Sequence, residues 1–349
     1  MLGVQALAGL PHFESKDRPT PEIHASNRMI ENLVSTIIPV FNRASMLREA
    51  VASVLAQSYR PIEIIIVDDG STDDTISVGV ELAKRYAQGL RVLRQSNKGP
   101  GLARETGRRA ARGEFIQYLD SDDLLLPRKF ETQVAGLRAH PECDVSYGKT
   151  RYRHADGNLE RGPWKGSGLK VDRMFPSFLV SRWWDTPTPL YRAALCERAG
   201  PWTDLKLEED WEYDCRIAAL GVRLHCCEDY VAEVRDHDGG RLCKSEPLEP
   251  ARMRERARAH ALIFSHARSA GIGSGSPEMK HFARELFLLS RQCGAAGLAE
   301  ESRELFALAR SASGDTRGNG WDFKLYEKLA EAAGWTRLGK MACYSDRLR

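Results

Sequence analysis

The feature that most constrains the fold is a regular alternation of strand-like and helix-like segments between residues 34 and 119. The strand-like segments are short, apolar and rich in β-branched residues, and the segments between them carry apolar residues at helical spacing. The expected strands are 34–40, 63–67, 91–94 and 114–119, and the expected helices are 46–57, 73–86 and 100–112. This alternation predicts an α/β fold, with a mostly parallel sheet flanked by helices.

Three of these strands end in polar residues, at the edge where open α/β sheets bind their ligands. The three ends read PVFN (39–42), DDGS (68–71) and DSDD (120–123). Asp120 and Asp122 stand two residues apart, so they point to the same side of an extended chain. Paired carboxylates suit a hard divalent cation, Mn²⁺ or Mg²⁺, whose shell is completed by phosphate oxygens and water. A solvated acidic turn is the alternative, and the position after a buried strand favours the metal.

Composition excludes some classes of function. The net charge of the 349-residue chain is +3, too small to indicate a nucleic-acid binder. No apolar run approaches the roughly 20 residues of a transmembrane helix, and residues 1–10 lack a signal-peptide pattern. The eight cysteines show no CxxC spacing, which predicts reduced thiols in a cytoplasmic protein. A zinc site at His225, Cys226 and Cys227 is the less favoured reading, because adjacent cysteines are an unusual ligand spacing.

The composition changes near residue 248, where we place a domain boundary. We expect a lead-in at 1–32, the α/β domain at 33–248 and a smaller helical domain at 249–349. Within the helical domain, 251–270, 279–293, 298–310 and 321–333 are the expected helices. Arginines at 252, 254, 256 and 258 suggest peripheral contact with an anionic membrane surface. Alternating arginines wrap around a helix, however, so a solvated helix is favoured, and the domain could instead form a homodimer.

Two long stretches carry a resemblance to a known family. They read STIIPVFNRASMLREAVASVLAQSYRPIEIIIVDDGSTDDT and NKGPGLARETGRRAARGEFIQYLDSDDLLLP. Both resemble family 2 glycosyltransferases, inverting enzymes with the GT-A fold, over roughly residues 33–245. The resemblance implies metal-dependent transfer of a sugar from a nucleotide-diphospho-sugar, by default a UDP-sugar, to a hydroxyl acceptor. The acceptor would be a glycan, a lipid carrier or a protein.

The resemblance also implies roles for individual residues. Pro39 and Phe41 would line the base and ribose pocket, Asp69 would bond the base, and Arg104 would contact the nucleotide. The family commonly has Asn where this chain has Glu105. The full set of implied donor-binding residues is Pro39, Val40, Phe41, Asp68, Asp69, Arg104, Asp120 and Ser121. The implied metal ligands are Asp122, Asp120 and, from the stretch EVRDHDGGRL, His237, which would complete the metal shell or contact the diphosphate.

Inverting transfer also needs a carboxylate that takes the acceptor proton. The stretch LKLEEDWEYDCRIAALG resembles the family's Glu-Asp motif, which makes Asp210 the general base and Glu209 its neighbour on the acceptor side. The alternative is the acidic first turn of a surface helix. Trp183, Trp184 and Asp185 are candidate acceptor contacts, because aromatic rings stack on sugars, although core packing explains a tryptophan pair equally well.

Two rival functions follow from the same residues. A phosphohydrolase of the haloacid-dehalogenase type would use YLDSDD as its nucleophile motif, but here that motif follows three strand–helix units and leaves VDDGS unexplained. A non-catalytic nucleotide-sugar-binding scaffold is the other rival. The presence of Asp120, Asp122 and Asp210 argues against it.

Overall fold

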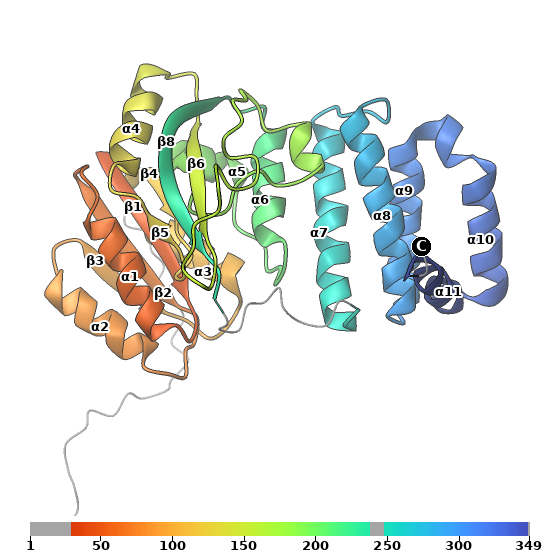
Figure 1. Cartoon of the computed structure of the whole chain (residues 1–349), viewed down its shortest axis with the longest axis horizontal. Coiled ribbons are helices and arrows are strands. Elements are labelled where there is room, and N and C mark those ends of the chain that lie inside the picture. The colour runs from red at the N-terminus through yellow and green to blue at the C-terminus, as the bar shows by residue number, and fades with distance from the viewer. Residues whose placement is uncertain (1–28, 238–247, 348–349) are drawn as a thin grey trace, which may run out of the picture.

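The computed structural model describes residues 29–237 and 248–347, which form two parts side by side (Figure 1). One part is a sheet of eight strands with helices packed against it, and the other is a row of helices. Most of the predicted lead-in lies outside the described residues, and the first strand already begins at Ile30.

The first half of the sheet is parallel, as the alternating pattern predicts. Its strands lie in the order β3, β2, β1, β4. The bounds are β1 (Ile30–Val40), α1 (Ala44–Leu55), β2 (Ile62–Asp68), α2 (Thr75–Arg85), β3 (Leu90–Arg94), α3 (Pro100–Ala110) and β4 (Gly113–Tyr118). Val40 pairs with Asp68 at the last rung of β1 and β2, so the two carboxyl ends lie level. The polar strand ends therefore meet at one edge of the sheet.

The second half of the sheet is mixed. β7 runs antiparallel between β4 and β6, β6 and β8 are parallel, and β5 is antiparallel to β8. The bounds are β5 (Leu124–Leu125), α4 (Lys129–Ala139), β6 (Val145–Arg153), η1 (Ser177–Leu179), β7 (Leu190–Arg192), α5 (Ala193–Ala199), α6 (Glu209–Ala219) and β8 (Leu224–Arg235). The predicted α/β class with a mostly parallel sheet is confirmed. After β7 reverses direction, the chain brings the first turn of α6 back to the polar edge.

Helix α3 packs very closely against the centre of the sheet, and Gly107 makes this approach feasible. A Cβ atom at this position would lie 2.3 Å from Ile37 Cγ2 and 3.2 Å from Val67 Cγ2. Both neighbours are fully buried side chains of β1 and β2, so neither has space to move away.

We expect Gly107→Ala to lower the free energy of unfolding by about 1–3 kcal/mol through overpacking. The helix preference of alanine, worth about 1 kcal/mol, offsets part of this loss. Urea unfolding measures the difference, with Gly275→Ala as the control because its Cβ meets open space. A Gly107→Ala protein as stable as wild type would show that α3 does not lie this close to β1.

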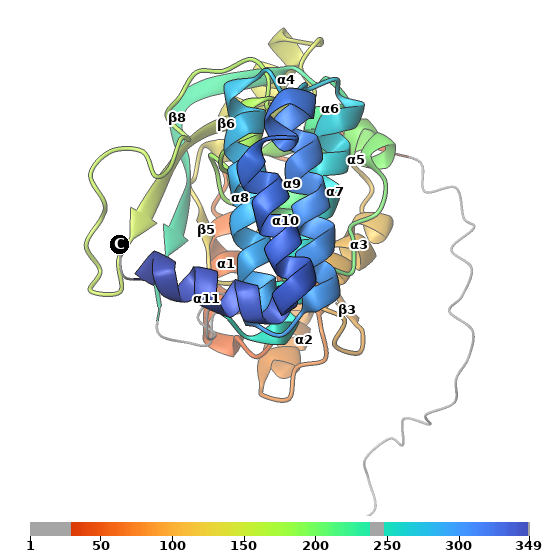
Figure 2. The same cartoon turned by 90° about the vertical axis from the view of Figure 1, so that its right-hand side faces the viewer.

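The described residues after the sheet form five helices, and Figure 2 shows them from their outer end. Their bounds are α7 (Pro250–Ser269), α8 (Pro277–Ala295), α9 (Ala299–Gly318), α10 (Trp321–Ala333) and α11 (Trp335–Arg347). The first four correspond to predicted helices, whereas α11 was not predicted. Within α9 the backbone breaks at Gly314, where φ is 75°.

One apolar cluster joins the sheet to these helices. It runs from Tyr118 of β4 through Tyr213 of α6 and Met253 of α7 to Phe282 of α8 and Phe306 of α9. A second apolar cluster lies wholly within the sheet part, between Val34 and Leu190, whereas the helices after residue 248 share the first cluster with the sheet. The division into domains therefore stays a prediction. Within the described ranges, no helix combines the length and apolar character that crossing a membrane requires.

Candidate active site

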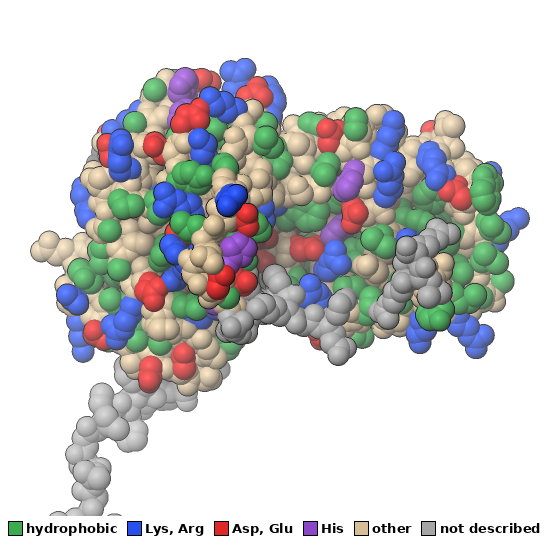
Figure 3. Space-filling view, viewed as in Figure 1, with side chains coloured by type: hydrophobic (Ala, Val, Ile, Leu, Met, Phe, Trp, Pro, Cys, Tyr) green, Lys and Arg blue, Asp and Glu red, His purple; other side chains and the backbone are tan. Residues whose placement is uncertain are grey.

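The polar strand ends surround a pocket of about 530 Å³. On the face drawn in Figure 3, charged side chains of both signs gather where the sheet meets the helices. The pocket lining includes most of the predicted site residues: Pro39, Val40, Phe41, Asp69, Arg104, Asp120, Ser121, Asp122, Asp185, Glu209 and Asp210. Segments far apart in the sequence thus supply one continuous site.

The two aspartates after β2 have different environments. Asp69 lines the pocket, and its carboxylate accepts hydrogen bonds of 2.8 Å each from Gln95 Nε2, Lys98 N and Gly99 N. It therefore fixes the loop that opens α3 and keeps an acceptor position for one further donor. Asp68 is 1% exposed, lies outside the lining and pairs with Arg94 Nε at 3.2 Å. Its predicted contact with the donor is wrong in this structure, because its carboxylate is buried behind the strand end.

Arg104 joins two acidic motifs across the pocket. Its guanidinium bonds Asp120 Oδ1 at 2.6 Å and Glu209 Oε1 at 2.7 Å, and it lies over the ring of Trp202. Burial would lower the pKa of Arg104, but Asp120 and Glu209 outweigh burial and raise it, so the group stays protonated. Asp120 therefore faces Arg104, which differs from its predicted role as a metal ligand. Glu105, the departure from the family pattern, instead bonds Arg108 and Arg109 on the same helix.

Asp122, the second aspartate of the DSDD stretch, has different partners from Asp120. His237 Nε2 lies 2.9 Å from Asp122 Oδ2, and Arg43 Nη1 lies 3.4 Å from the same oxygen. Burial would raise the pKa of Asp122, but Arg43 and then His237 outweigh it and lower the pKa. Asp123 also lines the pocket and accepts a bond from Arg235 N. Burial, followed by the charges of Asp122 and Asp120, raises its pKa well above the ordinary value.

The Asp122–His237 pair is the part of this site that fits a divalent cation. No group of three potential metal ligands converges anywhere in the part of the chain that the structure describes. A carboxylate and an imidazole, however, are donors that Mn²⁺ accepts, and a phosphate-bound cation needs only one or two protein ligands. The same carboxylate already balances the positive charge of Arg43. The donor chemistry thus fits a cation that arrives together with a diphosphate.

Asp210 lies at the start of α6 and is held by a residue that the sequence analysis missed. Arg182 Nη1 donates to Asp210 Oδ2, and Arg182 Nε donates to Asp214 Oδ2 at 2.6 Å. Asp214 stands one helical turn after Asp210 and also accepts bonds of 3.0 Å from Trp184 Nε1 and Tyr191 OH. Arg182 thus clamps two aspartates that stand four residues apart on α6. Their spacing in the DWEYD stretch could have indicated a shared basic partner, but nothing in the sequence identified Arg182 as that partner.

The two tryptophans do not form a sugar platform. Trp183 is 5% exposed, Trp184 is fully buried, and both pack edge-on against Phe178. Trp184 donates its indole N–H to Asp214. The prediction that one ring stacks on the acceptor is wrong in this structure, because both belong to the core. Asp185 does line the pocket, and Lys165 Nζ donates to it.

The charge environment of Asp210 predicts how activity depends on pH. Burial would raise its pKa, but Arg182 and then Arg104 outweigh burial and lower it below the ordinary value of about 4. A base with a lowered pKa is already ionised above about pH 4. If Asp210 is the base that the resemblance implies, we expect the kcat for hydrolysis of a nucleotide-sugar to show no acid limb from Asp210 between about pH 5 and 8. An acid limb near neutral pH that disappears in Asp210→Asn would contradict this.

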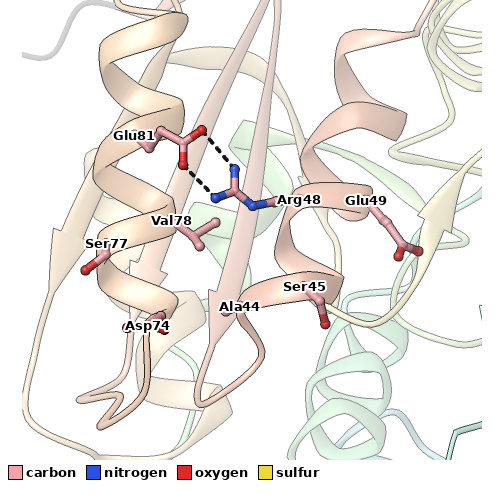
Figure 4. Close-up of a pocket in the computed structure, with 8 residues that line it drawn as sticks. All are labelled: Ala44, Ser45, Arg48, Glu49, Asp74, Ser77, Val78 and Glu81. Carbon is pink, nitrogen blue, oxygen red and sulfur yellow. Dashed lines mark hydrogen bonds and ion pairs between the residues drawn. The ribbon is translucent and has the colours of Figure 1, made fainter.

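A second hollow, of about 710 Å³, lies apart from this pocket between α1 and α2 (Figure 4). Arg48 reaches across it to Glu81 with bonds of 3.0 and 2.6 Å. Both side chains are about half exposed, and ion pairs of this kind contribute little. None of the predicted site residues lines this hollow, so the strand-end pocket is the candidate active site.

Comparison with known sequences gives a family match. Residues 35–193 match the model described as "Glycosyl transferase family 2". A Nostoc protein named "Uncharacterized glycosyltransferase" is 31% identical over 196 residues, which cover 55% of this chain and 58% of that protein. A relative with the same description from Escherichia coli is 38% identical over 118 residues, 33% of each chain. One from Rickettsia felis is 38% identical over 149 residues, 42% of this chain and 23% of the relative. The chain thus spans less than two thirds of the length of these relatives.

Comparison with solved structures identifies the fold. Residues 1–349 of Staphylococcus aureus TarS in complex with UDP-GlcNAc align over 90% of this chain and 92% of that chain, with 20% identity and a TM-score of 0.64. The mannosyltransferase PcManGT from Pyrobaculum calidifontis, in complex with GDP-Man and Mn²⁺, aligns over 90% and 86%, with 19% identity and a TM-score of 0.50. At these identities the likeness shows a shared fold, the GT-A arrangement followed by helices.

Proposed function

We propose that this chain, whose residues 35–193 match the glycosyl transferase family 2 model, transfers a sugar from a nucleotide-diphospho-sugar to a hydroxyl acceptor with inversion. The observation that carries the proposal is the position of Asp210. It stands in the same pocket as Asp69, Asp120 and Asp122, and Arg104 links the two sides. Donor-binding groups and a candidate base are thus close enough to act on one bound substrate.

In this proposal the nucleotide lies between the ends of β1 and β2. Pro39 and Phe41 line the base and ribose, and the remaining acceptor position on Asp69 takes a base N–H. A UDP-sugar is the donor we favour, supported by the TarS complex with UDP-GlcNAc. The PcManGT complex with GDP-Man shows that a guanosine donor is compatible with this fold.

The chemistry at the sugar falls to Asp210. Its carboxylate, fixed by Arg182, takes the proton of the acceptor hydroxyl as the oxygen attacks the anomeric carbon from the face opposite the diphosphate. Asp122 and His237 would hold Mn²⁺ or Mg²⁺, which when bound neutralises negative charge on the leaving diphosphate. Arg43 lies beside the same carboxylate and adds positive charge at that end of the pocket. The class of acceptor, whether glycan, lipid-linked or protein, stays a prediction.

The alternative phosphohydrolase reading gains no support. Its nucleophile would be Asp120, whose Oδ1 is bonded to the buried guanidinium of Arg104. A carboxylate neutralised in this way is a poor nucleophile, since the ion pair stabilises its charge.

Slow hydrolysis of the donor, in which water replaces the acceptor, tests the proposal without knowledge of the acceptor. UDP-, GDP- and dTDP-sugars are each incubated with the protein and Mn²⁺, and the released nucleoside diphosphate and the anomer of the free sugar are followed by NMR. We expect release from one nucleotide class, with the first-formed sugar inverted at the anomeric carbon. Retention at that carbon would contradict the mechanism, and binding without turnover would favour the scaffold alternative.

A further inference from the structure

One wall of the pocket is a short segment, residues 204–210, that leads into α6. Lys206, Leu207, Glu208, Glu209 and Asp210 all line the pocket, so this wall carries the proposed base. Its backbone has an unusual conformation at Glu208, where φ is 60° and ψ is 17°. A residue other than glycine adopts this left-handed conformation only where its surroundings hold it there. The contacts that hold Glu208 in this conformation therefore also fix the wall that carries Asp210.

Several side chains that contact this segment come from α7, the first described helix after β8 (Figure 1). Arg256 Nε donates to Glu208 Oε1 at 2.9 Å, and His260 Nδ1 lies 3.1 Å from Glu208 Oε2. Glu255 Oε2 accepts a bond of 2.6 Å from the backbone N–H of Lys206. Arg258 Nη2 donates to Asp204 Oδ1 at 2.7 Å. We call these four side chains of α7, Glu255, Arg256, Arg258 and His260, the α7 anchor.

Burial decides which of these contacts matter most. Arg258 and Asp204 are 51% and 62% exposed, so their ion pair is screened and weak. Arg256 and Glu208 are 26% and 24% exposed, and His260 is 2% exposed. The bond from Arg256 to Glu208 is thus a shielded ion pair, and His260, whose Nδ1 also lies 2.9 Å from the Arg256 carbonyl oxygen, stands beside the second oxygen of Glu208.

The anchor itself stands on the apolar core shared by the two parts of the chain. His260 stacks on Phe282 of α8 with a ring separation of 5.6 Å and an angle of 8°. Trp211, the residue after Asp210, packs edge-on against both of these rings. Its indole N–H donates to the carbonyl of Phe178 at 2.7 Å. The first turn of α6 is therefore held from behind by α7 and α8, on the side away from the strand ends.

We propose that the α7 anchor positions Asp210, so that the C-terminal helices form a working part of the active site. The proposal rests on the proposed function, in which Asp210 is the base. Arg256 and His260 hold Glu208 in its left-handed conformation, and this conformation sets the direction in which the next two side chains enter the pocket. These residues act through Glu208 and touch no substrate, so they are positioning residues.

The test compares Arg256→Ala with Arg254→Ala. Arg254 lies on the same helix and pairs at 2.9 Å with Glu301 of α9, so its removal takes an arginine and a more exposed ion pair from α7 without touching residues 204–210. Hydrogen–deuterium exchange of peptides covering 204–212 reports the restraint directly and needs no substrate. The kcat and KM of donor hydrolysis, with Mn²⁺ and the most active nucleotide-sugar, report its effect on the chemistry.

We expect faster exchange in 204–212 for Arg256→Ala and wild-type exchange for Arg254→Ala. We also expect kcat to fall between about 10- and 100-fold in Arg256→Ala, with the donor KM within about twofold of wild type, because a small misplacement of a reacting group costs this much. Arg256→Lys restores the charge and should recover part of the rate. Glu208→Gln, which keeps an acceptor for Arg256, should lie between Arg256→Ala and wild type.

Unchanged exchange and kcat in Arg256→Ala would overturn the proposal. Equal losses in Arg256→Ala and Arg254→Ala would overturn it as well, since they would reflect helix stability alone. A wild-type protein that hydrolyses none of the nucleotide-sugars would contradict the proposed function instead. In that case the exchange comparison still decides whether α7 restrains the segment.

Discussion

Asp210→Asn is expected to lower the kcat of donor hydrolysis by about 10²–10⁴-fold, the usual contribution of a general base. Asparagine has nearly the same shape and keeps an oxygen to accept the backbone N–H of Trp211, which bonds Asp210 Oδ1 at 2.7 Å. It cannot take a proton, and it loses the charge that Arg182 balances. The loss should therefore appear in kcat, while the Kd for UDP with Mn²⁺ should stay near wild type, because the proposed nucleotide site lies at the ends of β1 and β2.

Glu209→Gln is the matched comparison for this variant. Glu209 adjoins Asp210 but bonds the guanidinium of Arg104, and burial, followed by the charge of Asp210, raises its pKa. We expect a smaller loss of kcat than for Asp210→Asn. If Asp210→Asn retains turnover within tenfold of wild type and Glu209→Gln does not, the base is Glu209.

Arg182→Ala is expected to lower the free energy of unfolding by about 3–5 kcal/mol at pH 7, because it leaves buried carboxylates without their counter-charge. Arg182 is 10% exposed, Asp214 is 1% exposed, and the guanidinium bonds both Asp210 and Asp214. Removing the guanidinium also removes the main influence that lowers the pKa of Asp210. Any acid limb of kcat from Asp210 should then move to higher pH in the variant.

Urea unfolding measures the first effect, with Arg254→Ala as an exposed control that should change stability by about 1 kcal/mol or less. The double variant Arg182→Met with Asp214→Asn removes the buried charge together with its partner, so it should recover part of the loss. A single Arg182→Ala variant as stable as the exposed control would show that the clamp does not form.

The sequence predicted the elements and the strand ends well, because both depend on local pattern. The apolar run at β1 and the helical spacing of α1 each lie within about a dozen residues, and the polar ends follow directly. Helix α11 was missed because it follows immediately after Gly334, which reads as the end of the preceding helix.

Partners that lie far apart in the chain could not be predicted. The ion pair between Arg182 and Asp210 spans 28 residues, and that between Arg104 and Glu209 spans 105. Their formation depends on how β7 and α6 return to the sheet edge. The tryptophan pair could not be assigned for the same reason. The sequence fits Trp184 either as an exposed sugar platform or as a core residue, and its hydrogen bond to Asp214 decides for the core.

In the proposed function, the strand-end pocket binds a nucleotide donor with a divalent cation held at Asp122. The most direct test is the melting temperature of wild type and Asp122→Ala with UDP, GDP or dTDP, each with and without Mn²⁺. A ligand at about 100 times its Kd stabilises the folded state by about 2.7 kcal/mol. The account predicts a rise for one nucleotide, UDP being favoured, that needs Mn²⁺ and is lost in Asp122→Ala. No rise with any nucleotide in the presence of Mn²⁺, or an equal rise in Asp122→Ala, would contradict it.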